Sequence, residues 1–177
     1  PQQEAGLHHA AGVGLHRFLG KFSARLHEGL TLFVRHAAWL DAVPQHEKAE
    51  QRNTKSRLQT MRDQRRDDKY DPPRPRIKSG ADLIGHLFEV GPVSPGGMGP
   101  VPLTFQEIEA WARMTGVQLT AWEVRTLRSL SREYLAELRA AESPGRIPPY
   151  STTTNAQQQV DTAMALRRQM RGVVADD

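Results

Sequence analysis

The sequence lacks cysteine altogether and is poor in aromatic residues. Its 177 residues include no cysteine, aromatic residues make up 6%, and apolar residues make up 38%. Without thiols the chain has no disulfide, no thiolate zinc site and no cysteine nucleophile. The apolar content is lean for one large core at this length. We therefore expect a small core with extended, solvated helices attached to it.

Long apolar runs are also missing. No run approaches the roughly 20 residues that span a bilayer, and the first residues, PQQEAGLHHAAG, have neither the basic region nor the apolar stretch of a signal peptide. Together with the absence of cysteine, this composition fits a reducing cytoplasm. We expect no membrane partner.

Motifs that would indicate catalysis or metal binding are absent as well. The glycine loop PGGMGP is not followed by the lysine of a phosphate-binding loop, and its prolines remove backbone donors. The seven histidines form no H-x-x-x-H or H-E-x-x-H pair, so we expect them to be solvated or interfacial. Ser129 and Ser131 lack a G-x-S-x-G setting. The prediction is a non-enzyme with no catalytic residue, no cofactor and no metal.

What the chain does contain is helical periodicity. Apolar residues recur at steps of three, four and seven from Val13 to Val43, which predicts an amphipathic helix. The following polar segment, Gln45 to Lys69, is expected to be a second, basic helix. Between Pro44 and Lys78 there are eleven Lys/Arg and six Asp/Glu, while the rest of the chain nearly balances. Such a segment is either a solvated helix or an attractor for acidic partners or nucleic acid.

Proline-rich stretches divide the chain into four parts. We expect a helical arm over residues 1–70, a proline-rich linker over 71–79, a helical core over 80–142, and a tail over 143–177 that is partly disordered or weakly helical. Within the core, Ser79 is expected to cap a short helix, ADLIGHLFEV. The predicted fold class is all-α, with a small helical-hairpin core and long helical extensions.

Two helix starts in the core are marked by the same spacing. Thr104 stands three residues before Glu107, and Thr120 stands three residues before Glu123. This is a capping box, in which the threonine oxygen accepts from an amide of the first turn and the glutamate accepts from the cap amide. It predicts one helix from about 105 to 115, ended by Gly116 in a left-handed conformation. A second helix follows from about 121 to 141.

A row of arginines is the sharpest functional feature of the second helix. At 100° per residue, Arg125, Arg128 and Arg132 border its apolar arc. Two helices and a short turn with such a row suggest a helix-turn-helix DNA-binding protein. However, Glu123 in the first turn would repel phosphate, so nucleic acid is the less favoured partner.

The core sequence also resembles a family of small tailed-phage proteins. The shared pattern, EvGP…GGMG…PLTxxEIxAW…tGvxLxxWExxxLrxLSxxYL, is followed in the family by a proline-aromatic ending. The resemblance spans roughly Leu83 to Tyr150, and Tyr150 replaces a tryptophan of the family. The positions that carry it are Glu89, Gly91, Pro92, Gly96, Gly97, Met98, Gly99, Pro102, Leu103, Thr104, Glu107, Ile108, Trp111, Gly116, Leu119, Trp122, Glu123, Leu127, Leu130, Ser131, Tyr134 and Leu135.

These proteins look similar to tail assembly chaperones, which are made alongside the tape-measure protein. The resemblance implies a non-catalytic factor that holds the tape-measure or tail-tube protein in the host cytoplasm during assembly. On this hypothesis Trp122, Arg125, Arg128 and Arg132 contact the partner. A minor structural protein of the neck or tail, present in the virion, is the alternative, and self-association is left open.

Overall fold

Helices are the regular secondary structure of the residues that the structure describes, and loops join them. The computed structural model describes the backbone of residues 4–45 and 54–152, with side chains from Ser23 onward. The helices in these ranges are α1 (Glu4–Asp41), α2 (Arg57–Arg65), α3 (Ala81–Val90), α4 (Phe105–Thr115) and α5 (Ala121–Ala140). The predicted all-α class is confirmed there. Part of the predicted basic helix and the tail beyond Thr152 lie outside the described residues.

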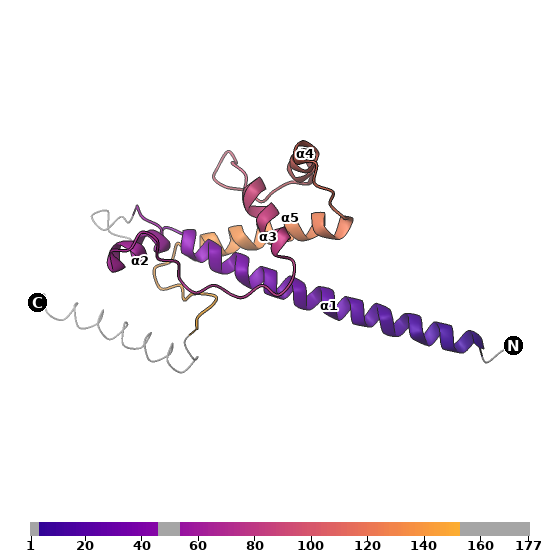
Figure 1. The fold of residues 1–177 in the computed structure, drawn as a ribbon. Helices are drawn as coiled ribbons and strands as arrows, with labels where there is room; N and C mark the ends of the chain where they lie inside the picture. The colour runs from indigo at the N-terminus through magenta and orange to yellow at the C-terminus, as the bar shows by residue number, and fades with distance from the viewer. Residues whose placement is uncertain (1–3, 46–53, 153–177) are drawn as a thin grey trace, which may run out of the picture.

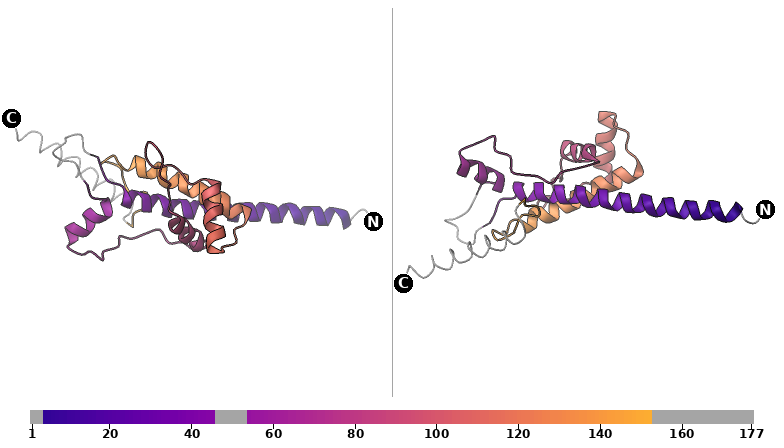
Figure 2. Two further views of the ribbon diagram at one scale, coloured as in Figure 1. Left: turned by 90° about the horizontal axis from the view of Figure 1, so that it is seen from above. Right: turned by 60° about the horizontal axis from the view of Figure 1, so that its bottom comes forward.

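The two longest helices, α1 and α5, lie side by side and run parallel. Trp122 near the start of α5 donates from Nε1 to Ser23 Oγ at 3.1 Å, and Tyr134 further along donates from its hydroxyl to Asp41 Oδ2 at 2.7 Å. The contacts follow the same order along both helices, as Figures 1 and 2 show, and the first half of α1 projects beyond the other helices. In the same views α4 crosses α5 steeply instead of running along it.

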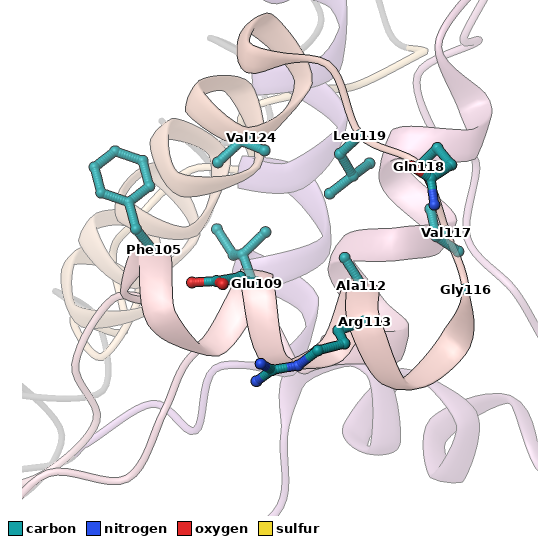
Figure 3. Close-up of a pocket in the computed structure, with 10 residues that line it drawn as sticks. Phe105, Glu109, Ala112, Arg113, Gly116, Val117, Gln118, Leu119 and Val124 are labelled. Carbon is teal, nitrogen blue, oxygen red and sulfur yellow. The ribbon is translucent and has the colours of Figure 1, made fainter.

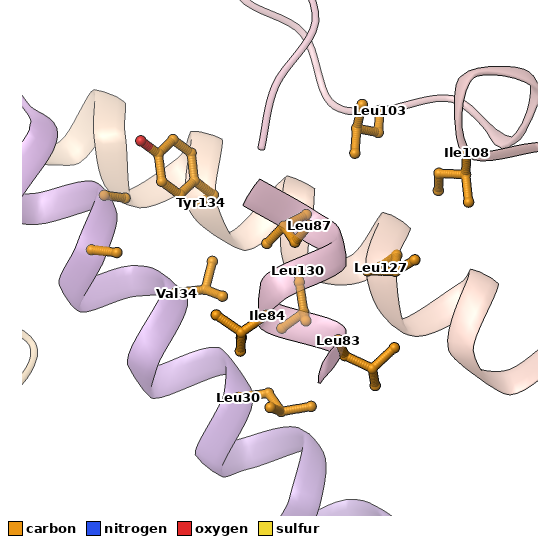
Figure 4. Packing of buried hydrophobic residues seen from close by; sticks show 12 residues of the cluster. Leu30, Val34, Leu83, Ile84, Leu87, Leu103, Ile108, Leu127, Leu130 and Tyr134 are labelled. Atoms are coloured by element: carbon orange, nitrogen blue, oxygen red, sulfur yellow. The ribbon is translucent and has the colours of Figure 1, made fainter. Parts of the chain in front are cut away.

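One apolar cluster joins four of the helices (Figure 4). Leu30 and Val34 of α1 meet Leu127 and Leu130 of α5, and all four side chains are fully buried. The other buried members are Ala37, Ala38, Leu83, Ile84, Leu87, Leu103, Ile108 and Tyr134. The core therefore includes the second half of α1, which the sequence had placed in an N-terminal arm. Its apolar stripe is covered because α3 and α5 pack on it.

A second, smaller cluster joins α2 to the far end of α1. Trp39, Leu40, Ala42 and Ala141 are buried there, with Leu58 and Met61 of α2 packed against them. The described part of the predicted basic helix, 54–69, is helical only over α2. It ends at Arg66, which adopts a left-handed conformation with φ 54°.

Arg57 at the start of α2 is the main polar group of this cluster. It is 7% exposed and donates to the carbonyl oxygens of Ala141 and Ser143, the latter at 2.8 Å. Its guanidinium also lies 4.8 Å from the centre of the Trp39 ring. One side chain therefore satisfies free carbonyls at the carboxyl end of α5.

The predicted capping of α3 by Ser79 is wrong. The cap residue is Gly80, which has φ 75°, and no side chain makes a capping hydrogen bond. A Cβ on Gly80 would lie 3.2 Å from a methyl group of Leu26 and 3.4 Å from Leu30. The chain therefore turns tightly against α1 at a glycine, and this close approach sets where α3 begins.

His36 is also placed differently from the expectation that the histidines are solvated or interfacial. It is 4% exposed, stacked on Trp39 at a centroid distance of 6.1 Å and edge-on to Tyr150 at 5.7 Å. Burial lowers the pKa of its imidazole below the ordinary value of 6.5, Arg74 lowers it further, and Asp71 and the Pro73 carbonyl oppose the shift. The neutral ring is thus part of the interior.

Candidate protein-binding surface

Two capping boxes fix the starts of α4 and α5. Thr104 Oγ1 accepts from the Glu107 amide at 3.2 Å, and Glu107 Oε2 accepts from the Thr104 amide at 2.7 Å. Thr120 and Glu123 make the same pair of bonds at 3.3 and 2.7 Å. Each box satisfies donors that a helix start leaves free.

These bonds also hold the two glutamates in their charged form. The pKa of Glu107 is lowered, first by the hydrogen bond from Ser94 and then by those from Thr104. The pKa of Glu123 is lowered by the amide and hydroxyl of Thr120. Both carboxylates are engaged in capping, and Glu107 also accepts from Ser94 of the preceding loop, which gives them a structural role.

The turn between the helices opens a groove on one side of them. Gly116 ends α4 with φ 74°, a left-handed conformation that glycine adopts without steric cost. The chain then swings through residues 117–120 into α5. As Figure 3 shows, the groove lies between α4, this turn and the start of α5.

The groove has a volume of about 620 Å³ and a largely apolar lining. Phe105 of α4 and Val124 of α5 lie across from each other, with Leu119 from the turn between the helices (Figure 3). Phe105 is 48% exposed although it is aromatic. The other lining residues are Ile108, Glu109, Ala112, Arg113, Gly116, Val117 and Gln118. An apolar side chain of a partner therefore has a concave surface to occupy.

The predicted arginine row lies on α5 beside this groove, and only Arg128 contacts a residue that lines it. Arg128 follows Val124 by one helical turn, and its guanidinium lies over the Phe105 ring, 4.5 Å from the centroid. The Nε atom of Arg128 is buried without a hydrogen-bond partner. Arg125 and Arg132 are exposed further round the helix. The row therefore consists of one partly buried arginine that packs on the Phe105 ring and two exposed charges further round the helix.

Trp122, which the sequence groups with these arginines as a partner contact, faces α1 and not the groove. Its ring is half-buried against the core cluster, and its Nε1 bond to Ser23 ties it to α1. The other tryptophan of this region, Trp111, meets His86 edge-on at 5.1 Å. The groove and Trp122 therefore lie on different sides of α5.

Two buried polar residues were not recognised in the sequence. Ser131 Oγ accepts from the Leu103 amide at 2.8 Å and donates to the Pro92 carbonyl at 2.8 Å. It fastens both ends of the glycine loop to α5. Arg57 was counted with the solvated charges of the basic segment. The spacing of neighbouring residues does not predict these hydrogen bonds, because their partners lie far away along the chain.

A second pocket, of about 410 Å³, lies between α1 and the segment before α3 and is lined by Arg25, Leu26, Gly29, Leu30, Arg76, Ile77, Lys78 and Ser79. Among the described residues, no three His, Asp or Glu side chains are grouped closely enough to hold a metal ion. None of their helices combines the length and the apolar character of a membrane span. Of the two pockets, the groove between α4 and α5 is the one that lies beside the arginine row.

A comparison with known protein families finds a match for the segment that contains this groove. Residues 93–136 match the phage tail assembly chaperone family. The matched segment is about a quarter of the chain, and it agrees with the resemblance seen in the sequence. It includes α4, most of α5 and every residue that lines the groove.

This match to a tail assembly chaperone supports a role in phage tail assembly. No curated protein and no solved structure matches the chain significantly. The whole of α1 and α2, which supply part of the two buried clusters, lies outside the matched segment.

Proposed function

We propose that the chain is a non-catalytic tail-morphogenesis factor that binds a phage tail protein, either the tape-measure or the tail-tube protein. The observation that carries this proposal is the groove between α4 and α5. Its lining lies wholly within the segment that matches tail assembly chaperones. The opposite side of α5 packs on α1, so the groove is the side of this segment left open to a partner.

The chemistry of the groove suits a protein partner. Protein interfaces are enriched in aromatic residues, methionine and arginine at their cores. Phe105 under the Arg128 guanidinium is such a combination. The exposed Arg125 and Arg132 would steer an acidic partner segment toward the groove and discourage a basic one. Binding takes place in the host cytoplasm during assembly, before the tail polymerises.

The test is binding of the whole chain to the tape-measure and tail-tube proteins encoded in the same genome. Each is co-expressed with the chain, and the affinity of any complex is measured. Phe105→Ala removes the aromatic wall of the groove and is expected to weaken binding by about 30-fold, the effect of a 2 kcal/mol hot spot. Ile147→Ala is the matched control, because Ile147 is 62% exposed and lies outside the matched segment.

Two further assays separate the proposed function from its alternatives. A minor virion protein would be present in finished particles at fixed copy number, whereas an assembly factor is absent from them. A DNA-binding protein would be retained on duplex DNA, and retention would fall steeply with salt. Arg125→Ala with Arg132→Ala would abolish that retention. Failure to bind either tail protein, or equal loss in Phe105→Ala and Ile147→Ala, would contradict the proposal.

A further inference from the structure

The pocket between α1 and the linker before α3 is a second concave surface of the chain. Its volume of about 410 Å³ is within the range of sites that hold a small ligand or a side chain of a partner. It shares no lining residue with the groove between α4 and α5, and all of its lining residues precede the segment that matches tail assembly chaperones. The proposed function therefore leaves this pocket without a role.

The inner wall of the pocket is apolar and held by the core. Leu30 is fully buried in the core cluster, and Leu26 and Ile77 pack against that cluster. At the edge of the pocket, the close approach of Gly80 to Leu26 and Leu30 fixes the linker against α1. Side chains packed in this way occupy defined rotamers. The wall is therefore preformed, and it offers an apolar surface to an occupant.

The rim of the pocket is positively charged. Its exposed lining residues include Arg25, Arg76 and Lys78, and no acidic residue lines it. Within the described part of the chain, none of these three forms an ion pair. Elsewhere in the linker, by contrast, Arg74 is paired with Asp71 at 2.9 Å. Three unpaired cations around one opening attract a negatively charged group.

Gly29 leaves volume in this pocket that the fold does not require. It lies in the interior of α1, where glycine is destabilising relative to alanine. A Cβ at this position would meet nothing within 4 Å, so no neighbouring group demands a glycine. Glycine allows a ligand to approach the backbone closely. The absent side chain therefore keeps the pocket open beside the basic rim.

We propose that this pocket binds an acidic peptide segment of a protein partner. An apolar side chain of the segment packs on Leu26 and Ile77, and the carboxylates beside it pair with the basic rim. A phosphate backbone would match the rim but has no apolar group for the inner wall. The bases of a single strand stack on aromatic side chains, and none of the lining residues is aromatic. The site is independent of the groove and of the tail protein proposed to bind there.

The probe is a short acetylated and amidated peptide, Asp-Glu-Leu-Glu-Asp, added to the full isotope-labelled chain. NMR spectra should show saturable shifts of the amides of Gly29, Ile77 and Lys78, with a Kd of about 1 mM for so small a contact. The peptide Asp-Glu-Ser-Glu-Asp keeps the charge but lacks the apolar side chain. It should bind about 10-fold more weakly or worse.

A substitution that fills the pocket tests its location. Gly29→Leu extends a side chain into the open volume and should weaken binding of the leucine peptide by about 10-fold or more. Gly85→Leu is the matched control, because Gly85 is exposed on α3, has the same free space around its Cβ and does not line the pocket. Both substitutions raise helix propensity, so thermal unfolding should show that neither variant loses stability.

A second pair of variants tests the charge of the rim. Arg76→Ala with Lys78→Ala should weaken binding by about 3- to 10-fold, the effect of two exposed charge pairs. Added salt should weaken binding to the wild type in the same direction. Arg125→Ala with Arg132→Ala removes the same net charge from α5 and should leave binding unchanged.

The proposal is supported if the shifts lie at the pocket, disappear in Gly29→Leu and persist in Gly85→Leu. It is overturned if the leucine peptide causes no shift at concentrations well above this Kd, or if the serine peptide binds equally well. Loss of binding in the Arg125 and Arg132 variant would assign the peptide to the groove instead. Tighter binding of oligothymidylate at the same amides would make the pocket a nucleic-acid site and would also overturn the proposal. None of these results alters the test of the proposed function, which uses the tail proteins and Phe105→Ala.

Discussion

Replacing Arg57 with alanine is expected to destabilise the fold far more than its place in a polar, basic segment suggests. The substitution removes the donors to two carbonyl oxygens at the end of α5 and the contact with the Trp39 ring. Hydrogen bonds from charged donors contribute about 1.5–3 kcal/mol each. Burial lowers the pKa of the Arg57 guanidinium, so desolvation offsets part of this contribution. We expect a net loss of about 3 kcal/mol in the free energy of unfolding.

The matched control is Arg65→Ala on the same helix. Arg65 also lies over an aromatic ring, at 4.1 Å from the centre of Tyr70, but it is exposed. Removing it should cost no more than about 1 kcal/mol. Urea unfolding followed by circular dichroism measures the free energy of unfolding of both variants. In thermal unfolding, Arg57→Ala should lower the melting temperature by about 6–12 °C. Equal and small losses in the two variants would refute the role assigned to Arg57.

Three further predictions concern single positions. Gly116→Ala should cost about 1 kcal/mol in unfolding free energy because φ is 74°, whereas Gly85→Ala, on an open helical surface, should stabilise by about 0.5–1 kcal/mol. Ser131→Ala should cost about 2–3 kcal/mol by leaving a buried amide unpaired, with Ser129→Ala nearly neutral as control. Stability should fall as pH drops below about 6.5, because the unfolded chain takes up a proton at His36 that the folded chain excludes until lower pH. In His36→Phe this pH dependence should be reduced; unchanged dependence would contradict the account.

Local signals in the sequence were enough to place α4 and α5. The capping boxes at Thr104 and Thr120 and the left-handed Gly116 depend on residues within four positions of each other. Such short-range chemistry can be read from spacing. The same is true of the all-α class, because helical periodicity is also a local property.

Contacts between distant residues could not be predicted in this way. Ser131 and Arg57 look like ordinary helix-surface residues in the sequence, and their acceptors lie 39 and 84 positions away. Gly80 caps α3 because α1 is close behind it, which the sequence before α3 does not reveal. The groove was missed for the same reason, since its walls come from two helices whose crossing is set by packing.

The placement of α1 links the fold to the proposed function. The segment that matches tail assembly chaperones carries two apolar surfaces on α5, one with Leu127 and Leu130 and one with Val124 in the groove. Leu30 and Val34 of α1, which lies outside the match, bury the first surface together with Leu83, Ile84 and Leu87 of α3. Among the described residues, α1 and α3 cover one side of α5, and the side that carries Val124 stays open as an apolar face. That face, bordered by Arg128 and its exposed neighbours, is where a tail protein is expected to bind.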